Sequence, residues 1–280
     1  MAQRINPKRT LIVLTRRHEE FYLNQVRDVS QSNLIVQPDN RGTAAAIFYA
    51  MMRLARLDPN SVVAVFPSDH YVSDDRRFML YSELAIEMAQ QRPAQLVLLG
   101  IRPNRAETEF GWIEPGERVG DSKFLSVRRF WEKPSTTLAA RLWKQGCLWN
   151  SFVMAGTVRC VLTLAARVLP EFRRAFASAW PALGTPQESL AIASIYTHLP
   201  ARDFSREVLA RSARSLLVVP VEEVYWNDLG DARRVYETLA RARIRPGWLM
   251  QRPPRNRNDF VRRVLPRLSS FQRRARDRQL

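Results

Sequence analysis

Asp69 and His70 occupy a position in the chain that suits chemistry. They follow five apolar residues, 62–66 (VVAVF), and the strand-ending pair Pro67 and Ser68. Such a run is typical of a strand that is buried on both faces. In open α/β sheets ligands bind beyond the carboxyl ends of the strands, and a carboxylate there is a natural Mg²⁺ ligand. The structural alternative is that Asp69 caps the turn after the strand.

The first part of the chain alternates between short apolar runs and amphipathic stretches. Strands are predicted there at 9–15, 33–38, 61–66 and 95–100. Helices are predicted at 18–29, at 43–57 with Thr43 as the expected cap, and at 75–91. Strands that alternate with helices at this spacing predict a mostly parallel sheet with right-handed crossovers.

The pattern changes after residue 101. Two antiparallel strands, 110–114 and 124–132, are expected on either side of a turn that contains glycine. The remaining predicted elements are helices at 135–145, at 157–180 with a break at Pro170, at 188–198 and at 231–243, and strands at 148–155 and 215–221. The expected fold class is therefore α/β, with a Rossmann-like, mostly parallel sheet and a small antiparallel subsheet.

The net charge of the 280-residue chain is strongly positive but unevenly distributed. Of the formal charge of +17, +11 belongs to residues 241–280, which contain thirteen arginines and two aspartates. We expect one domain over residues 1–246 and a flexible, Arg-rich tail over 247–280. Such a tail favours weak contact with a polyanion. A dedicated nucleic-acid or membrane-surface binder is the alternative class, but the sequence shows no base-reading motif.

Cysteine content and hydropathy indicate the cellular compartment of the protein. Cys147 and Cys160 are the two cysteines, which is too few for a disulfide framework and favours a reducing compartment. No apolar run approaches the length of a membrane span, and the first ten residues lack the apolar core of a signal peptide. We expect a cytoplasmic protein, whose oligomeric state the sequence leaves open.

Six short segments carry a resemblance to a known family. They are QPDNRGTAAA (37–46), FPSDH (66–70), ETEFGWIE (107–114), FWEKP (130–134), CLWNSF (147–152) and WNDLGD (226–231). Their order and spacing resemble the sugar-1-phosphate nucleotidylyltransferases, most closely the mannose-1-phosphate guanylyltransferase branch, over residues 10–246. The resemblance implies the nucleotide-diphospho-sugar transferase fold. It also implies a reaction in which a sugar 1-phosphate oxygen attacks the α-phosphate of a nucleoside triphosphate and pyrophosphate leaves.

The resemblance assigns the nucleotide and the cation to four residues. Gly42 and Thr43 match the base-recognition loop, where small residues let a purine reach backbone groups. The alternative is a plain helix start. Asp69 and Asp228 match two metal-binding aspartates, which share one Mg²⁺ that bridges phosphate oxygens. For Asp228 the alternative is a turn residue before Gly230.

The resemblance assigns the sugar 1-phosphate to four other residues. Gly111 matches a glycine that lets the sugar ring lie against the backbone, although a bend in a strand is a frequent role for such a glycine. In the EKP motif, Glu132 accepts sugar hydroxyls and Lys133 meets the sugar phosphate. An exposed charged pair before Pro134 is the structural alternative. Asn150 matches a sugar-contacting asparagine.

Four neighbouring residues receive lesser roles. Phe152 stands where many members of the family have glycine, so the sugar pocket is expected to differ in shape. His70 is interpreted as support for its turn and not as a base, because a sugar phosphate is already ionised. Asp203 and Glu207 are interpreted as residues that shape the pocket.

The glycine-rich loop that is the family's strongest signature, of the type GxGTRLxPLT, does not occur in the 280 residues. The strand that precedes the loop in the family would lie between the strands at 10–15 and 62–66, so two strand edges should be unpaired. Three explanations are open: a start upstream of Met1, a decayed gene product, or a non-catalytic relative that retains sugar or nucleotide binding. We expect GTP and mannose 1-phosphate as substrates and severely reduced transferase activity in this chain.

Overall fold

The computed structural model describes residues 7–247 and has the predicted α/β fold. Its strands are β1 (Ile12–Thr15), β2 (Leu34–Gln37), β3 (Val62–Val65), β4 (Tyr71–Val72), β5 (Leu96–Ile101), β6 (Gly111–Arg118), β7 (Leu125–Glu132), β8 (Leu148–Thr157), β9 (Leu216–Val221) and β10 (Trp226–Asn227). Its α-helices are α1 (Glu19–Tyr22), α2 (Gly42–Ala55), α3 (Asp75–Gln91), α4 (Thr136–Lys144), α5 (Val158–Val168), α6 (Pro170–Ala179), α7 (Glu188–His198) and α8 (Ala232–Arg241). A π-helical segment spans Ser205–Leu209.

The elements divide into two compact units. Unit 1 contains the described residues up to Pro67 together with Asp74–Val224, and unit 2 contains Ser68–Ser73 together with the described residues from Tyr225 onward. Residues 7–246, predicted as part of one domain, thus contribute to two compact units. The predicted boundary after residue 246 remains a prediction, because the tail from 248 to 280 lies outside the described residues.

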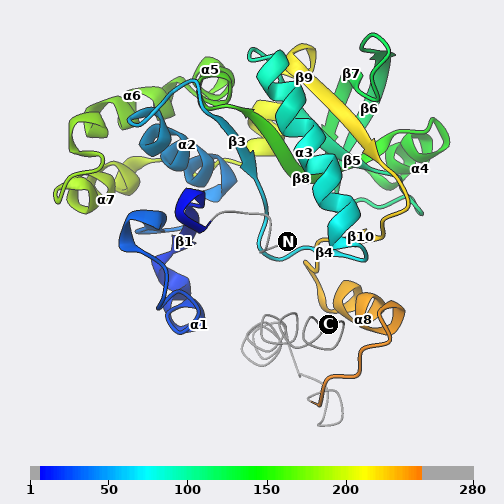
Figure 1. The fold of residues 1–280 in the computed structure, drawn as a ribbon, viewed down its shortest axis with the longest axis horizontal. Helices are drawn as coiled ribbons and strands as arrows, with labels where there is room; N and C mark the ends of the chain where they lie inside the picture. Colours follow the sequence, from blue (N-terminus) through cyan, green and yellow to red (C-terminus); the bar gives the residue numbers. More distant parts are fainter. Residues whose placement is uncertain (1–6, 248–280) are drawn as a thin grey trace. The chain divides into compact units, whose positions relative to one another are not determined.

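Unit 1 is built on a six-stranded sheet of order β3-β8-β5-β9-β7-β6 (Figure 1). Strands β5 and β9 pair in parallel, and β8 pairs antiparallel with both β3 and β5. Strands β3, β5 and β9 therefore point in one direction, with β8 inserted between them in the opposite direction. Strands β6 and β7 form the expected antiparallel pair.

The interior strands of this sheet are covered on both faces. All six residues of β5 are buried, and so are five of the six in β9, which explains their unbroken apolar sequences. Leu96, Leu98 and Val218 belong to a core that also contains residues of α2, α5 and α6. Helix α3 lies along the sheet and contacts β3, β8, β5 and β9 (Figure 1).

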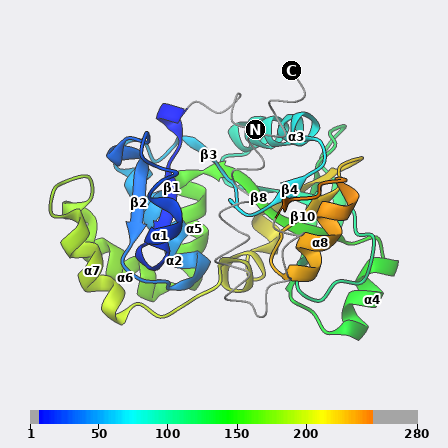
Figure 2. The same cartoon turned by 90° about the horizontal axis from the view of Figure 1, so that it is seen from below.

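Strands β1 and β2 form a separate parallel pair in unit 1, beside the helices α2, α5, α6 and α7 (Figure 2). Among the described residues, β1 pairs only with β2, and β3 pairs only with β8. The two unpaired strand edges expected from the sequence are therefore present. Every residue of β1 and β3 is partly exposed, in contrast to β5.

Side-chain caps begin four of the eight described α-helices, α3, α4, α5 and α8. Asp74 accepts a hydrogen bond from the backbone N–H of Arg77 and begins α3, and Ser135 begins α4 in the same way. Helices α3 and α7 have the predicted bounds. Helix α2 differs, because Asn40 Oδ1 accepts from the backbone N–H of Gly42 and no side chain of the cap residue closes the turn. The prediction that Thr43 caps this helix is wrong.

The predicted helix over residues 18–29 is also wrong. Only the four residues of α1 are α-helical there, after a 3-10 turn at Arg16–His18. None of the α1 residues is buried. Short helices gain most of their stability from packing an apolar face, and this segment has no such face to pack.

Unit 2 is held together by a two-stranded ribbon and one helix. Strand β10 pairs antiparallel with β4, and Asp231 caps α8. The buried side chains of Val235 and Leu239 form the apolar contact of this helix. The buried amide of Asn227 donates hydrogen bonds to Thr238 Oγ1 (3.0 Å) and to the backbone oxygen of Arg234 (3.2 Å), which fixes the ribbon to the helix.

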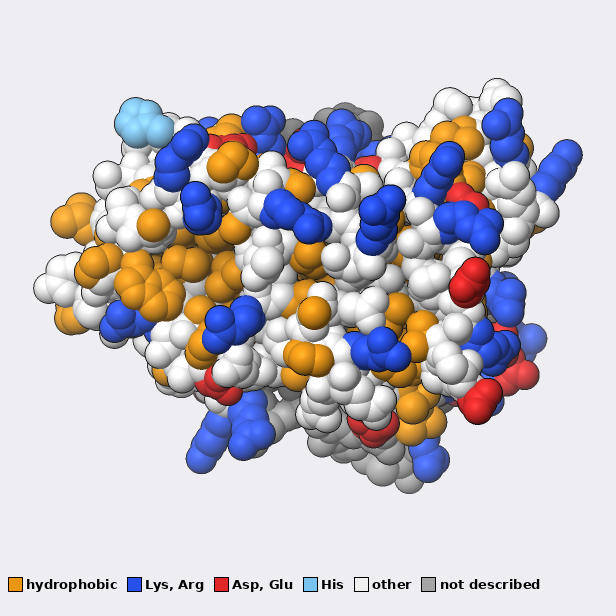
Figure 3. Space-filling model, turned by 90° about the horizontal axis from the view of Figure 1, so that it is seen from above, with side chains coloured by type: hydrophobic (Ala, Val, Ile, Leu, Met, Phe, Trp, Pro, Cys, Tyr) orange, Lys and Arg blue, Asp and Glu red, His pale blue; other side chains and the backbone are white. Residues whose placement is uncertain are grey.

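The surface carries many basic side chains without one dominant basic stripe on the face shown in Figure 3, where Lys and Arg are interspersed with polar and apolar groups. Nothing on that face singles out a track for a nucleic-acid backbone. Within residues 7–247, no helix combines the length and apolar character needed to cross a bilayer.

Candidate functional site

Three of the predicted sugar-binding residues come together in unit 1. Gly111 begins β6 and pairs with Glu132, the last residue of β7. A β-carbon at Gly111 would lie 2.8 Å from Glu132 Oε2 and 3.2 Å from the β-carbon of Asn150. Any residue other than glycine would therefore displace one of the other two side chains. The close approach of backbone and side chains is the arrangement that the sequence interpretation requires.

A bulge in β8 sets the position of Asn150. The pairing of β8 with β5 shifts register between Leu98 and Gly100. On the β8 side, Phe152 has a φ of +60°, and its N–H donates to Asn150 Oδ1 (3.1 Å). Bulges of this kind redirect side chains beside active sites. The left-handed φ also gives a reason for the glycine that the resemblance predicts here, because glycine adopts it without the steric cost that Phe152 has.

Lys133 has an unusual backbone conformation and a different partner from the one expected. Its φ is +48°, in the left-handed region. Its ammonium group lies 3.3 Å from Glu109 Oε2, and both side chains are about half exposed, at 49% and 54%. The structural alternative, a charged pair of Glu132 with Lys133, is thus replaced by an exposed ion pair between Lys133 and Glu109.

Glu132 is electrostatically perturbed. Burial raises the pKa of its carboxyl group to about 7, and the nearby carboxylate of Asp203 raises it as well. Lys133 and Arg206 lower this pKa, but by less. A carboxyl group in this state is close to half ionised at neutral pH, so the approach of hydrogen-bond donors can shift it to the ionised form.

The predicted base-recognition residues lie at the start of α2, against the segment 202–204. The backbone N–H of Ala44 donates to the backbone oxygen of Arg202 (3.1 Å), and the N–H of Phe204 donates to Thr43 Oγ1 (2.8 Å). Gly42 has a φ of +79°, and a β-carbon there would overlap the carbonyl oxygen of Arg202. The two segments pack so closely that glycine is required.

Asp203 connects the two groups of residues in unit 1, a role that the sequence interpretation missed. Its Oδ2 accepts from the hydroxyl of Thr43 (3.3 Å), and its charge raises the pKa of Glu132. Its Oδ1 accepts from the N–H of Arg206 (2.9 Å), which holds the carboxylate in place. Glu207, predicted to shape the pocket with it, pairs instead with Arg211 (2.9 Å).

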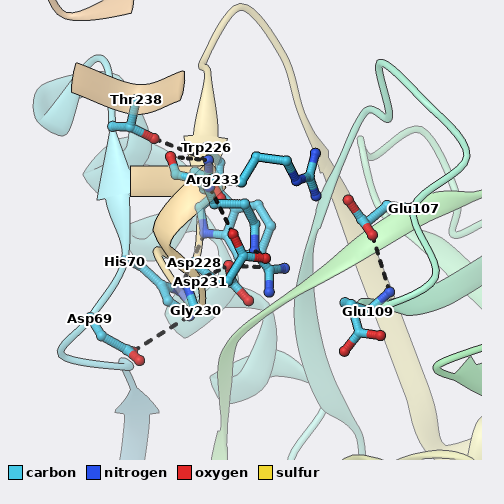
Figure 4. Close-up of polar contacts among 12 residues, drawn as sticks. Asp69, His70, Glu107, Glu109, Trp226, Asp228, Gly230, Asp231, Arg233 and Thr238 are labelled. Carbon is cyan, nitrogen blue, oxygen red and sulfur yellow. Dashed lines mark hydrogen bonds and ion pairs between the residues drawn. The ribbon is translucent and has the colours of Figure 1, made fainter. Parts of the chain in front are cut away.

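The two predicted cation ligands, Asp69 and Asp228, both belong to unit 2 (Figure 4). Desolvation raises the pKa of the Asp69 carboxyl group, and the negative charge of Asp228 raises it further. The Asp69 side chain is nevertheless 61% exposed. The Asp228 carboxylate is thus near enough for its negative charge to act on Asp69. Repelling carboxylates of this kind are stabilised by a shared cation.

Two contacts hold the carboxylate of Asp228. Its Oδ1 accepts from the N–H of Gly230 (3.1 Å) and lies 3.2 Å from Nη1 of Arg234. The guanidinium of Arg234 is only 6% exposed and also contacts Asp231 (3.0 Å). The turn role proposed as an alternative for Asp228 is therefore real. It fixes the carboxylate and is compatible with a role in cation binding.

The acid pair fits Mg²⁺ in its donor chemistry. Within residues 7–247, no group of three or more His, Cys, Asp and Glu side chains could hold a metal ion. Mg²⁺ usually takes one or two carboxylates and completes its octahedron with water and substrate phosphates. Asp69 and Asp228 match that habit, and their assignment as ligands remains a prediction.

A family model described as nucleotidyl transferase matches residues 2–243. The chain belongs to the nucleotidyl transferase family. A mannose-1-phosphate guanylyltransferase of Escherichia coli is 26% identical over 233 residues, which are 81% of this chain and 49% of the relative. The xanthan biosynthesis protein XanB of Xanthomonas campestris is 27% identical over 224 residues, 79% of this chain and 46% of its own length. This member of the family thus spans about half the length of these curated relatives.

Solved structures agree with this assignment. A crystal structure from Thermus thermophilus, named as a mannose-1-phosphate geranyltransferase, superposes with a TM-score of 0.72 at 27% identity and covers 91% of this chain and 68% of that one. A UDP-glucose pyrophosphorylase bound to UDP-glucose has a TM-score of 0.51 at 14% identity, with 82% of this chain and 80% of that chain covered, and so shares the fold. The predicted fold and the family resemblance of this nucleotidyl transferase are confirmed.

His70 contacts Trp226 of strand β10, and its predicted role as support for its own turn stays a prediction. Burial lowers the pKa of its imidazole to about 4, so the ring is neutral at pH 7. Its Nδ1 accepts a hydrogen bond from Trp226 Nε1 (3.2 Å), and its Nε2 lies 3.9 Å from Asp69 Oδ1. The sequence interpretation named neither Trp226 nor Arg234. The only sequence signal for them was the WNDLGD segment (226–231), which begins with Trp226 and ends three residues before Arg234.

Proposed function

We propose that this chain acts on GTP and mannose 1-phosphate as a mannose-1-phosphate guanylyltransferase. An oxygen of the sugar phosphate attacks the α-phosphorus of GTP, the bond from that phosphorus to the bridging oxygen breaks, and GDP-mannose and pyrophosphate form. The observation that carries the proposal is Asp203, whose carboxylate touches Thr43 and acts electrostatically on Glu132. One carboxylate thus interacts both with Thr43, which is expected to contact the base, and with Glu132, which is expected to contact the sugar. The names of the curated relatives support the choice of substrates.

The sugar-binding role follows from the chemistry of Gly111, Glu132 and Asn150. Ionised Glu132 accepts hydrogen bonds from sugar hydroxyls, and these charge-assisted bonds are the stronger kind. Asn150 offers an amide as donor and acceptor, and the backbone at Gly111 admits a flat ring at close range. Lys133 gives up its exposed contact with Glu109 and neutralises the phosphate of the sugar substrate.

Asp69 and Asp228 would hold Mg²⁺, and Arg234 would keep Asp228 in position for it. The bound cation would neutralise negative charge on the phosphates. The buried guanidinium of Arg234 contacts both Asp228 and Asp231, so it holds the Asp228 carboxylate in place. The cation requirement and the cytoplasmic location are both parts of the proposal.

Turnover by the 280-residue chain is proposed to be severely reduced. The sequence contains no GxGTRLxPLT segment, which in the family cradles the triphosphate with backbone N–H groups. Substrate binding by Glu132, Asn150 and Thr43 does not depend on that loop. The chain should therefore retain binding of the nucleotide sugar when its rate of transfer is low.

Calorimetric titration and pyrophosphate release test the proposal together. GDP-mannose should bind the chain more tightly than UDP-glucose, and the Asn150→Ala variant should bind it about tenfold more weakly, as expected for a lost hydrogen bond of about 1.4 kcal/mol. The control is Asn60→Ala, because Asn60 is exposed on the 58–61 turn and has no predicted role in binding. Asn40→Ala is not a suitable control, because Asn40 Oδ1 accepts from the N–H of Gly42 at the start of α2. Asn60→Ala should bind as the wild type does.

Two results would contradict the proposal. If the chain binds neither GDP-mannose nor UDP-glucose, the proposed function is excluded. If it releases pyrophosphate from GTP and mannose 1-phosphate as fast as the full-length relatives do, the predicted impairment is excluded. Specific binding with no transfer at all would favour the non-catalytic relative over the transferase.

A further inference from the structure

Trp226 and His70 form a ring pair that the proposed reaction does not use directly. Trp226 belongs to β10, and His70 directly precedes β4, the strand that pairs with β10. Their ring centroids are 5.0 Å apart and the ring planes are perpendicular, at 89°. Trp226 is 4% exposed, and its indole N–H donates to His70 Nδ1 at 3.2 Å (Figure 4).

This hydrogen bond selects one tautomer of His70. A neutral imidazole carries one hydrogen, on either Nδ1 or Nε2. Because Nδ1 accepts from the indole, the hydrogen of His70 is on Nε2. That Nε2 lies 3.9 Å from Asp69 Oδ1, which is beyond hydrogen-bond length but close enough for the N–H dipole to act on the carboxylate.

We propose that Trp226 is a positioning residue for the cation site, acting through His70 on Asp69. The inference rests on the proposed function, in which Asp69 holds a divalent cation. In the tautomer that this hydrogen bond selects, the Nε2–H group presents a positive end to the Asp69 carboxylate. The other tautomer would turn a lone pair toward that carboxylate and repel it. Selection by Trp226 therefore holds Asp69 in the orientation that faces the cation.

The need for such a partner follows from the exposure of Asp69. Its side chain is 61% exposed, so solvent and packing alone fix its rotamer weakly. Asp228, in contrast, has the buried Arg234 and the N–H of Gly230 to orient it. Hydrogen-bond partners of metal-binding carboxylates and imidazoles commonly change metal affinity by about 10–100-fold when they are removed.

Two substitutions at His70 separate its two nitrogen atoms. His70→Gln places an amide N–H near the position of Nε2 and keeps a donor for Asp69. His70→Asn places a polar atom near Nδ1, which can accept from Trp226, but leaves no donor for Asp69. Trp226→Phe keeps an aromatic ring against His70 and removes the indole N–H, together with the volume of the second ring. Trp143→Phe, at a tryptophan that is 44% exposed on α4, is the matched control.

Two readouts are needed. Long-range ¹H–¹⁵N spectra report the tautomer of each of the three histidines in the chain, His18, His70 and His198, without any ligand. The EPR signal of free Mn²⁺ reports how much Mn²⁺ the chain binds, with Asp69→Asn as the background. We expect the Nε2–H tautomer for His70 in the wild type and in Trp143→Phe, and a mixture of tautomers in Trp226→Phe.

The expected Mn²⁺ affinity of each variant depends on whether it keeps a hydrogen-bond donor for Asp69. Trp226→Phe and His70→Asn should bind Mn²⁺ about tenfold more weakly, whereas His70→Gln and Trp143→Phe should keep the affinity of the wild type. An unchanged tautomer in Trp226→Phe would overturn the inference. So would a changed tautomer with unchanged Mn²⁺ affinity, or equal loss in His70→Gln and His70→Asn.

Failure of the proposed function would look different. If the wild-type chain binds no more Mn²⁺ than Asp69→Asn, then Asp69 is not a cation ligand and the inference falls together with that assignment. If the wild type binds Mn²⁺ and Trp226→Phe binds it equally well, only the positioning role of Trp226 is wrong.

Discussion

The two groups of candidate residues are fixed in different ways. In unit 1, Gly111, Glu132 and Asn150 stand on paired strands, which come so close that a β-carbon at Gly111 would clash with the other two side chains. In unit 2, Asp69 and Asp228 stand on turns beside a ribbon of two-residue strands, and side-chain contacts orient them. We therefore expect a change in the backbone to disturb the geometry of the unit 1 group most. The loss of one polar contact should disturb the unit 2 group most.

The largest expected effect is on the side-chain contacts of unit 2. Asp228→Asn removes one of the two carboxylates that pair with the guanidinium of Arg234, which is 6% exposed. Leaving a buried charge short of a partner destabilises a protein by about 3–5 kcal/mol, and the remaining contact with Asp231 places the expected loss at about 3 kcal/mol. Urea unfolding followed by tryptophan fluorescence measures it, since Trp226 lies in this unit.

The matched control for this prediction is Asp121→Asn. Asp121 is exposed in the turn between β6 and β7, and the substitution removes the same charge. It should leave the free energy of unfolding within about 0.5 kcal/mol of the wild type. Equal effects of the two substitutions would mean that the contact between Asp228 and Arg234 does not stabilise unit 2.

A comparison of two glycines tests the claim that the backbone fixes unit 1. Gly42 and Gly184 have nearly the same φ, +79° and +77°. A β-carbon at Gly184 meets no atom within 4 Å, whereas one at Gly42 would overlap the carbonyl of Arg202. Gly184→Ala should cost about 1 kcal/mol for the left-handed conformation. Gly42→Ala should cost about 3 kcal/mol, because overpacking adds to that term.

Thermal unfolding of both glycine variants and titration with GDP-mannose complete this test. Gly42→Ala should lower the affinity, because the start of α2 must move away from segment 202–204. Gly184→Ala should not. Equal stability of the two variants would show that the close contact between α2 and Arg202 relaxes freely.

Much of the fold could be predicted from the sequence, because local signals agree with the packing. Helix α3 has its predicted bounds, with Asp74 as its cap and an apolar face that meets the sheet. Helix α1 did not follow its prediction: none of its residues is buried, so packing adds little to the stability of a helix there. The ribbon of β4 and β10 was missed for a different reason: strands of two residues carry no periodic signal.

The candidate site was predicted in part, and the remainder depends on contacts between distant residues. Motif resemblance identified Gly111, Glu132 and Asn150, and the structure brings these together. Asp203 was interpreted as a residue that shapes the pocket, since nothing local to 203 reveals its contact with Thr43, 160 residues away. The tautomer selected by Trp226 likewise depends on a contact with His70 across 156 residues.

The pH dependence of binding examines the electrostatics of unit 1 and has a smaller expected effect. With the pKa of Glu132 at about 7, the ionised fraction and hence the affinity for GDP-mannose should rise about tenfold between pH 6 and pH 8. In Glu132→Gln this rise should disappear. Calorimetry across this pH range measures both, and a parallel rise in the variant would assign the effect to another group.

Stability should show the opposite trend for the same group. The pKa of Glu132 is raised in the folded chain from an ordinary value of 4.5, so the folded state holds the proton more tightly. Its contribution to the free energy of unfolding is fully present below pH 4.5 and is lost as the pH rises to 7. The wild type should therefore lose more stability than Glu132→Gln between these pH values.

The smallest expected effect on nucleotide-sugar binding is that of deleting the Arg-rich tail. We expect this deletion to disturb neither the unit 1 nor the unit 2 group of residues. Deletion of the chain after Gly247 removes most of the excess positive charge in residues 241–280. It should abolish retention on a polyanion resin at low salt, as expected from counterion release, and leave GDP-mannose affinity unchanged. A loss of nucleotide-sugar binding in the shortened chain would show that the tail belongs to the functional site.

A crystal structure of the chain with GDP-mannose tests the central claim most directly. The account predicts the mannose ring against the backbone of Gly111, with its hydroxyls within hydrogen-bond distance of Glu132 and Asn150, and the guanine beside Gly42 and Thr43. Density for the nucleotide sugar at any other place, with these residues uncontacted, would contradict it.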